Sequence, residues 1–261
     1  MMPLDHLELA PETPYIWRAR RPGATCRLIC FPHAGAGAGA YSEWAALLPP
    51  QVELAAVQLP GRQNRIGEDP FTDVGPLLDV LVHALRPVLQ GRYAFFGHSA
   101  GATLAFELAR ALQARGSRGP EQLFLSAQPG PGPSRVRRLH ELDQEAFRTE
   151  ILALGGIDPE IAEDEDVMDA MLYTLRADFT LFERHRLQPG AVLDCPITVL
   201  CGEQDPRAPL AEVQRWREHT AGAFRAEVYP GGHFYFLDSP AEVVSLIGAA
   251  LAAPSTHRSH A

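Results

Sequence analysis

Short apolar runs alternate with segments of helical periodicity over most of the chain. The apolar runs are continuous, as expected of strands that are buried on both faces of a sheet. Such an alternation predicts an α/β protein with a mostly parallel central sheet flanked by helices. The predicted strands are 26–31, 52–59, 93–98, 122–127, 197–201 and 225–229, and the predicted helices between them are 41–48, 74–89, 100–114, 210–219 and 240–252.

Residues 129–190 interrupt this alternation. The segment opens with Pro-Gly-Pro-Gly-Pro at 129–133, a stiff and irregular connector. Two helical patterns follow, near 142–154 and 165–184. We predict a helical insertion that is a candidate lid. For any single residue in it, ordinary core packing is an equally open alternative. The second pattern has one apolar face, formed by Met168, Met171, Leu172, Leu175, Phe179 and Phe182.

The composition is that of an average globular protein, with 46% hydrophobic and 21% charged residues among 261. We therefore predict a single domain over 1–261, with the lid insertion at about 129–190 and a disordered tail at about 254–261. The net charge of -9 disfavours nucleic-acid binding, which needs a basic surface. No apolar run approaches the ~20 residues of a membrane span, and the start lacks a signal-peptide pattern, so no membrane association is expected.

The four cysteines fall in or beside two predicted strands. Cys26 and Cys30 are separated by roughly 13 Å along an extended chain, which is too far for a disulfide. Cys195 and Cys201 are farther apart still. We predict reduced thiols and a cytoplasmic location. A disulfide between a cysteine of one strand and a cysteine of the other stays an open alternative.

The strongest local motif is Gly-His-Ser-Ala-Gly at 97–101. It lies between a predicted strand and a predicted helix, which is the setting of the nucleophile elbow of the α/β-hydrolase fold. The flanking glycines allow a tight turn that lifts the serine hydroxyl above the sheet. We therefore predict Ser99 as a nucleophile at the N-terminus of a helix, where developing negative charge is favoured.

A serine nucleophile needs a base and a carboxylate that orients the base. In this fold they follow the serine in the order Asp or Glu, then His. We predict Asp205 as the acid, because it follows the strand 197–201, with Glu203 as its rival. We predict His233 as the base, because it follows the last strand in a loop with two glycines.

The developing oxyanion needs two backbone N–H donors. We predict Ala100, directly after the nucleophile, and Ala34, in the glycine-rich loop 31–39. A dinucleotide site in this loop is an alternative, in which Arg62 would hold a 2′-phosphate, but the spacing is G-x-G-x-G rather than G-x-G-x-x-G. No H-E-x-x-H or zinc-type cysteine spacing occurs, so neither a metal nor a cofactor is expected.

Five motifs together resemble one family, the type II thioesterases. These are free-standing editing enzymes of polyketide and nonribosomal peptide (antibiotic) biosynthesis. The resemblance runs from about Cys30 to Leu237 and is far more specific than any single motif. The motifs are Phe-Pro-His-Ala-Gly at 31–35, Leu-Pro-Gly-Arg at 59–62, Gly-His-Ser-Ala-Gly at 97–101, Arg-Ala-Asp-Phe at 176–179 and Pro-Gly-Gly-His-Phe at 230–234.

The resemblance implies hydrolysis of acyl groups from the phosphopantetheine arm of an acyl or peptidyl carrier protein. It implies Ser99, Asp205 and His233 as the triad and Ala34 and Ala100 as oxyanion donors. It also implies that the insertion is a mobile lid around an acyl chamber, for which we expect lining residues Met168, Met171, Leu172, Leu175 and Phe179.

The carrier is expected to be a separate protein, because the chain has no Gly-x-Asp-Ser attachment site. Candidate basic contacts for it are Arg135, Arg137 and Arg138 at the lid entrance, with Arg62 and Arg65. Three alternatives stay open. The same triad suits an acyltransferase or cyclase and a small-molecule carboxylesterase, whereas a noncatalytic carrier-binding module would require a broken triad.

Overall fold

A computed structural model describes residues 7–132, 137–188, 190–237 and 240–252 of the chain. Its centre is an eight-stranded sheet with the strand order β1-β2-β4-β3-β5-β6-β7-β8. The strands from β3 to β8 are parallel to their neighbours, whereas β1 and β2 add an antiparallel edge next to β4. The strands are β1 Ala10–Thr13, β2 Ile16–Ala19, β3 Cys26–Phe31, β4 Val52–Val57, β5 Tyr93–His98, β6 Leu123–Ser126, β7 Ile197–Gly202 and β8 Phe224–Tyr229.

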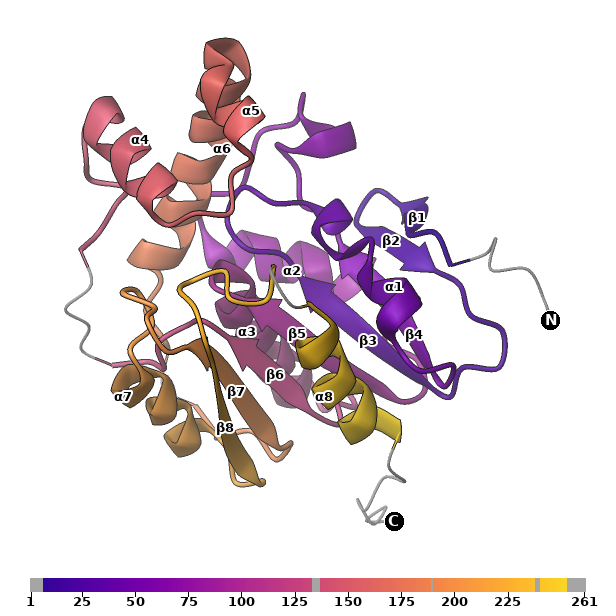
Figure 1. The fold of residues 1–261 in the computed structure, drawn as a ribbon. Coiled ribbons are helices and arrows are strands. Elements are labelled where there is room, and N and C mark those ends of the chain that lie inside the picture. Colours follow the sequence, from indigo (N-terminus) through magenta and orange to yellow (C-terminus); the bar gives the residue numbers. More distant parts are fainter. Residues whose placement is uncertain (1–6, 133–136, 189, 238–239, 253–261) are drawn as a thin grey trace.

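Helices cover both faces of the sheet (Figure 1). One face carries α2 and α3, which pack on each other, and the other carries α1 and α8. This arrangement is the predicted α/β-hydrolase fold. The helices are α1 Trp44–Leu47, α2 Val74–Ala84, α3 Ala100–Ala114, α4 Gln144–Ala153, α5 Pro159–Glu163, α6 Glu165–Arg184, α7 Leu210–Val213 and α8 Pro240–Ala252, with 3₁₀ turns η1 Ala38–Tyr41, η2 Gln63–Arg65 and η3 Gln214–His219.

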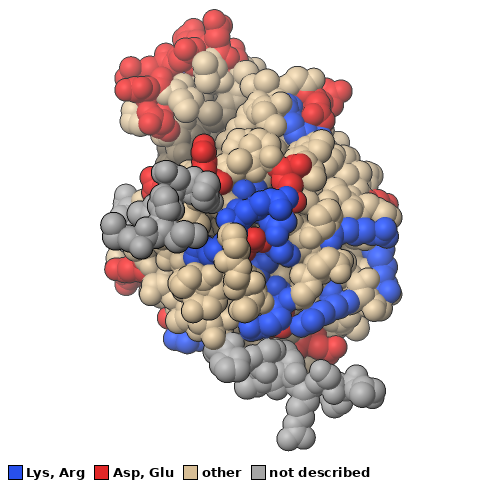
Figure 2. Space-filling view, turned by 90° about the vertical axis from the view of Figure 1, so that its right-hand side faces the viewer, with Lys and Arg blue, Asp and Glu red and all other residues tan. Residues whose placement is uncertain are grey.

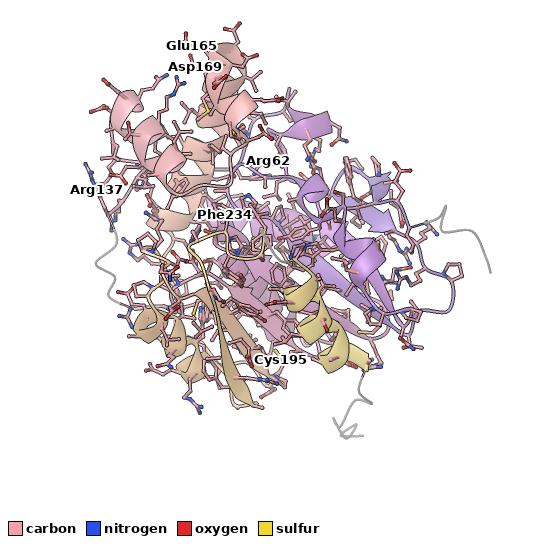
Figure 3. All side chains as sticks on the ribbon, viewed as in Figure 1. Arg62, Arg137, Glu165, Asp169, Cys195 and Phe234 are labelled. Carbon is pink, nitrogen blue, oxygen red and sulfur yellow. The ribbon has the colours of Figure 1, made fainter. Side chains whose placement is uncertain are left out.

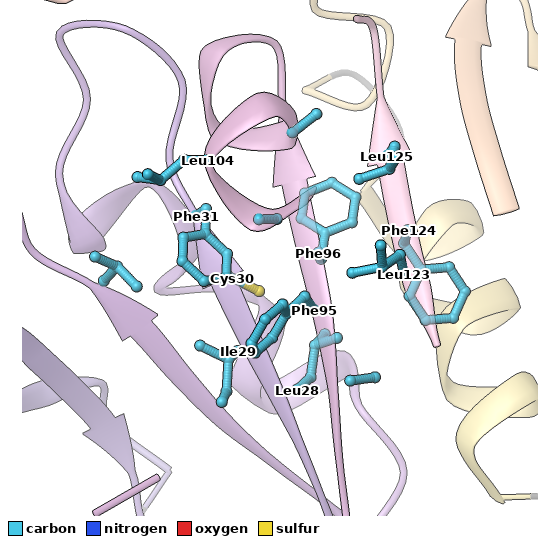
Figure 4. Packing of buried hydrophobic residues seen from close by; sticks show 14 of the residues in the cluster. Leu28, Ile29, Cys30, Phe31, Phe95, Phe96, Leu104, Leu123, Phe124 and Leu125 are labelled. Atoms are coloured by element: carbon cyan, nitrogen blue, oxygen red, sulfur yellow. The ribbon is translucent and has the colours of Figure 1, made fainter. Parts of the chain in front are cut away.

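The core lies between the central strands and the helices on each face. Residues 28–31 of β3 and all of β5 and β7 are buried, which explains why these runs are apolar without alternation. Phe31 and Phe95 on neighbouring strands meet edge to face with ring centroids 5.1 Å apart (Figure 4). The sheet is therefore a rigid base for the loops at its carboxyl edge.

Helices α4, α5 and α6 come between β6 and β7 and stand above the carboxyl edge of the sheet (Figure 1). Each begins at an aspartate whose side chain accepts a hydrogen bond from a backbone N–H of the first turn. They enclose a small second core formed by Leu139, Phe147, Ile151, Met168, Leu172 and Leu175. We refer to these three helices as the lid.

Several element boundaries differ from the prediction. The predicted helix 41–48 is a 3₁₀ turn followed by the four-residue α1, and the predicted helix 210–219 changes to 3₁₀ after Val213. Strand β4 ends at Val57 rather than at 59. The pair β1 and β2 and the short helix α5 were not predicted. The predicted tail 254–261 lies outside the described residues.

Candidate active site

The nucleophile elbow forms at the junction of β5 and α3. Ser99 has φ 54° and ψ -122°, a strained conformation for a residue with a side chain. A Cβ at Gly97 would lie 2.2 Å from the carbonyl oxygen of Gly101, and a Cβ at Gly101 would lie 2.1 Å from that of Phe31. Both flanking glycines are therefore required by close backbone approach.

A continuous hydrogen-bonded chain joins the three side chains predicted as the triad. His233 Nε2 lies 3.0 Å from Ser99 Oγ. His233 Nδ1 lies 2.8 Å from Asp205 Oδ2. The imidazole and the carboxylate are buried, whereas Ser99 is half-buried. These distances allow proton transfer from the hydroxyl to a ring nitrogen that the carboxylate orients.

The loop after β7 holds Asp205 and brings it to the base. Its Oδ1 accepts hydrogen bonds from the N–H groups of Arg207 at 2.8 Å and Ala208 at 3.2 Å. A Cβ at Gly202 would lie 2.2 Å from the carbonyl oxygen of Gly232, so the acid loop and the base loop are in direct contact. Glu203, the rival carboxylate, is exposed.

The glycine-rich loop after β3 lies beside Ser99. Ala34 borders the same two cavities as Ser99, and Ala100, as the first residue of α3, has an N–H without an intrahelical acceptor. A side chain between β4 and η2 anchors this loop, because Gln58 Oε1 accepts a hydrogen bond from the N–H of Ala38 at 2.7 Å. A Cβ at Gly37 would lie 2.6 Å from the same Oε1 atom, so a larger residue there would displace the Gln58 side chain.

Two further histidines pack beside the base. The His98 ring lies 5.2 Å from the His233 ring and 5.7 Å from the His33 ring, between centroids. Burial, with the neighbouring His233 and His33, lowers the pKa of His98 well below its ordinary value. Burial, with His233 and Arg62, lowers the pKa of His33 to about 3. Both rings are therefore neutral near pH 7 and add no positive charge next to the base.

His98 is held by a polar chain that the sequence analysis missed. Its Nδ1 lies 2.8 Å from Ser126 Oγ, which in turn lies 2.6 Å from the hydroxyl of Tyr235. Phe234 covers His33 from the other side at 4.9 Å between ring centroids. His233 therefore packs against a layer of rings that includes His98 and Phe234.

Two cavities meet at Ser99 and His233. The larger has a volume of about 620 Å³ and runs along the loop after β6 and the C-terminal end of α6, with Glu183, Arg138, Arg186 and Arg207 among its lining residues. The smaller has a volume of about 160 Å³ and lies under the lid. Its lid-side lining is mostly apolar, with Asp158 as the charged exception, and the apolar side chains are those of Ile151, Leu154, Ile157, Ile161, Met171, Leu175 and Phe179.

The residues predicted to line the chamber divide into two groups. Met171, Leu175 and Phe179 border the smaller cavity. Met168 and Leu172 border neither cavity, because they are buried in the second core with Phe147 and Ile151. The expectation that Met168 and Leu172 line the chamber is therefore corrected: these two side chains pack on α4 within the lid.

The predicted carrier contacts also divide. Arg62 and Arg65 are buried, and they pair with Asp178 and Glu68, so the prediction that these two bind a carrier is wrong. The Asp178 pairing also occupies the guanidinium that the dinucleotide alternative needed. Arg137 and Arg138 are exposed, and Arg137 lies at the edge of the lid (Figure 3). Arg135 lies outside the described residues.

The described residues contain no group of three or more His, Cys, Asp or Glu side chains arranged to hold a metal ion. None of the described helices has the length and apolar character needed to cross a bilayer. Cys26, Cys30, Cys195 and Cys201 all carry free thiols.

Comparison with known proteins gives a consistent result. A family model described as a thioesterase domain matches residues 26–251. The thioesterase PikA5 of Streptomyces venezuelae is 42% identical over 223 residues, which are 85% of this chain and 79% of that protein. The gramicidin S biosynthesis protein GrsT of Aneurinibacillus migulanus is 34% identical over 86% of this chain and 88% of its own length.

A solved structure extends the similarity to the fold. The type II thioesterase BorB from the borrelidin biosynthetic cluster superimposes with a TM-score of 0.84 at 38% identity, over 93% of this chain and 99% of its own. The match of the family model over most of the chain, together with this superposition, assigns the fold and the family. The chain belongs to the thioesterase family, within the α/β-hydrolase fold.

Proposed function

We propose that this chain is an editing, type II thioesterase that hydrolyses acyl groups from the phosphopantetheine arm of acyl or peptidyl carrier proteins. The observation that carries the proposal is the hydrogen-bonded chain Ser99–His233–Asp205 at the point where two cavities meet. The relatives support the same class, since they include a type II thioesterase of a biosynthetic cluster and a thioesterase of Streptomyces.

Each residue has a defined role in the proposed reaction. His233 Nε2 takes the proton of Ser99 Oγ as the oxygen attacks the thioester carbonyl. The N–H groups of Ala34 and Ala100 stabilise the oxyanion. His233 then gives its proton to the leaving thiol, and water hydrolyses the acyl-serine with His233 again as base. Asp205 stays ionised and holds the ring tautomer.

The two cavities suggest how a thioester would lie. The smaller one has a volume of about 160 Å³ and is lined mostly by apolar lid residues, which suits an acyl chain. The larger one carries arginines on its lining, which suit the anionic and polar pantetheine arm. We assign the acyl group to the smaller cavity and the arm to the larger.

A cytoplasmic location is part of the proposal. The free thiols of the four cysteines support it, because thiols persist in reducing compartments.

The decisive experiment compares wild type, Ser99→Ala and the exposed control Ser117→Ala on acyl-carrier thioesters. Loss of the nucleophile is expected to lower kcat by on the order of 10⁴-fold or more, with the control unchanged. Released free acid supports hydrolysis, whereas a dominant ester, amide or lactone would establish acyl transfer or cyclisation. Faster turnover of simple esters than of carrier thioesters would identify a carboxylesterase.

A further inference from the structure

One buried carboxylate joins the lid to the loop that carries Ala34. Asp178, on α6, is 2% exposed. Its Oδ2 accepts hydrogen bonds from the N–H of Gly35 at 2.7 Å and from Arg62 Nη1 at 2.6 Å. Its Oδ1 accepts from Arg62 Nη2 at 2.9 Å. Arg62 lies where the lid meets the sheet, and the two residues are 116 positions apart in the chain (Figure 3).

Stability alone is a weak reason for such a pair. Removing two charges from water costs free energy that their attraction often fails to return, so apolar residues of similar size frequently stabilise as well. A bidentate pair does fix geometry, because the planar guanidinium matches both carboxylate oxygens. The role of the fixed Asp178 carboxylate therefore depends on the group that it orients.

The oriented group is a backbone N–H in the turn that holds Ala34. The N–H of Ala36 donates to the carbonyl oxygen of His33 at 3.1 Å, which closes a four-residue turn. The turn itself leaves the N–H groups of its two central residues, Ala34 and Gly35, without acceptors. Asp178 accepts the one from Gly35. The N–H of Ala34 has no acceptor within the turn, and Ala34 borders both cavities that Ser99 borders.

The same helix also sets the shape of this turn by direct packing. Gly35 has φ +78°, and a Cβ there would lie 2.7 Å from Cδ2 of Leu175, three residues before Asp178 on α6. Thr174 Oγ1 donates to the carbonyl oxygen of Gly61 at 2.7 Å, next to Arg62 in the chain. A shift of α6 would therefore disturb the turn and the Arg62 loop together.

We propose that Asp178, supported by Arg62, is a positioning residue for the oxyanion hole. Its carboxylate fixes the peptide between Ala34 and Gly35, which adjoins the peptide that carries the N–H of Ala34. Together with the hydrogen bond from the N–H of Ala36 to the carbonyl oxygen of His33, it holds the N–H of Ala34 toward the tetrahedral oxygen. The seating of the lid helix and the readiness of the oxyanion hole are thereby coupled. The inference rests on the proposed function, because it assigns a role within that reaction.

The test compares Asp178→Ala, Asp178→Asn and Arg62→Lys with a matched control, Glu53→Gln. Glu53 is also a buried carboxylate that accepts from two arginines and one backbone N–H, but it lies at the start of β4, away from Ser99. Each folded variant is assayed for kcat and KM on one thioester. Two inhibitors are then compared, an acyl trifluoromethyl ketone and an uncleavable thioether of the same chain length.

The ketone reports the oxyanion hole directly. Ser99 Oγ adds to its carbonyl carbon, the hydroxyl proton moves to His233, and the carbonyl oxygen becomes the bound oxyanion. We expect Asp178→Ala to lower kcat by about 10²-fold, as for loss of one oxyanion donor. Ketone affinity should fall in parallel, while KM and thioether affinity change less than about twofold. Asp178→Asn and Arg62→Lys should give smaller losses of the same pattern.

Three results would overturn the inference: unchanged kcat and ketone affinity in folded Asp178→Ala, equal losses for ketone and thioether, or the same pattern in Glu53→Gln. If Asp178→Ala does not fold, wild-type kcat in Asp178→Asn overturns it as well. Failure of the proposed function gives a different signature, because wild type itself would then fail to release acid or would match Ser99→Ala.

Discussion

Two histidines beside the base are kept neutral by their surroundings. His98 Nε2 and His33 Nδ1 are buried without a hydrogen-bond partner among the described residues. A protonated ring would bury an unpaired N–H donor at each of these atoms, which costs free energy in addition to desolvation of the charge. His33 and His98 therefore act as packing residues around His233.

The lowered pKa of His98 predicts that the free energy of unfolding depends on pH and that His98→Gln reduces this dependence. The pKa of His98 is lowered in the folded state, so below the unfolded value of ~6.5 only the unfolded chain takes up the proton. The free energy of unfolding should then fall by up to about 1.4 kcal/mol per pH unit as the pH drops from 6.5 towards the folded pKa. In His98→Gln this part of the slope should disappear.

Urea unfolding at pH 8, 6 and 5 measures that slope, with the exposed His83→Gln as the control. The comparison uses slopes rather than absolute stabilities, because the substitution also removes the hydrogen bond with Ser126. Equal slopes in wild type and His98→Gln would show that His98 is not the group responsible.

At the scale of elements, α6 contributes to three parts of the molecule. Met168 and Leu172 pack in the core of the lid, Asp178 and Leu175 contact the Ala34 loop, and Met171 borders the smaller cavity. The period of apolar residues predicted the helix and its buried face. It could not show which of these residues pack in the lid core and which border a cavity, because that depends on which element lies opposite each turn.

Filling the smaller cavity from α6 should change chain-length preference. Met171→Trp places a larger ring in a space of about 160 Å³, so longer acyl chains should lose binding while acetyl retains it. We expect kcat/KM for a hexanoyl thioester to fall by about tenfold or more relative to acetyl, since one or two displaced methylenes have effects of this size.

The matched control is Val167→Trp, on the same helix but 46% exposed. It should leave the hexanoyl-to-acetyl ratio at the wild-type value. A ratio unchanged in Met171→Trp, or changed equally in both variants, would contradict the assignment of the acyl group to this cavity.

At the scale of the whole molecule, charge is unevenly distributed. The net charge is -9, and acidic side chains gather at the top of the lid (Figure 2). The exposed members there include Asp158, Glu160, Glu163, Glu165 and Asp169. An acidic carrier would be repelled by that surface, so the arginines beside the larger cavity are the better contact.

Arg138 and Arg186 are the exposed members of that group, and removal of Arg138, at the lid edge, should affect the carrier specifically. Arg138→Ala is expected to raise KM several-fold for a carrier-bound acyl group and to leave KM for the N-acetylcysteamine thioester unchanged. The difference should shrink in 0.5 M salt, because exposed charges are screened.

Arg115→Ala, between α3 and β6, serves as the control, since Arg115 is similarly exposed and pairs with Asp79. It should change neither KM. Equal increases in KM for both substrates in Arg138→Ala would point to the active site itself rather than to carrier docking.

The sequence-based predictions were wrong or incomplete where residues that are neighbours in space are far apart in the chain. The strands β1 and β2 have only four residues each, and β1 has no buried residue, so their local pattern is weak. Arginine is usually a surface residue, yet Arg62 is buried and paired with Asp178. Asp178 stood in a motif of the family, but the motif did not reveal what it contacts.

The sequence by itself determined the fold class and the family, and it predicted Ser99, Asp205 and His233 as nucleophile, acid and base, because these follow from local patterns: buried runs, periodic helices and tight glycine turns. Only the tertiary structure decided that Asp178 pairs with Arg62 and accepts from Gly35, 143 positions away. It also decided which apolar residues of α6 face a cavity. The physical reason is that burial and pairing depend on distances between elements, which no local pattern contains.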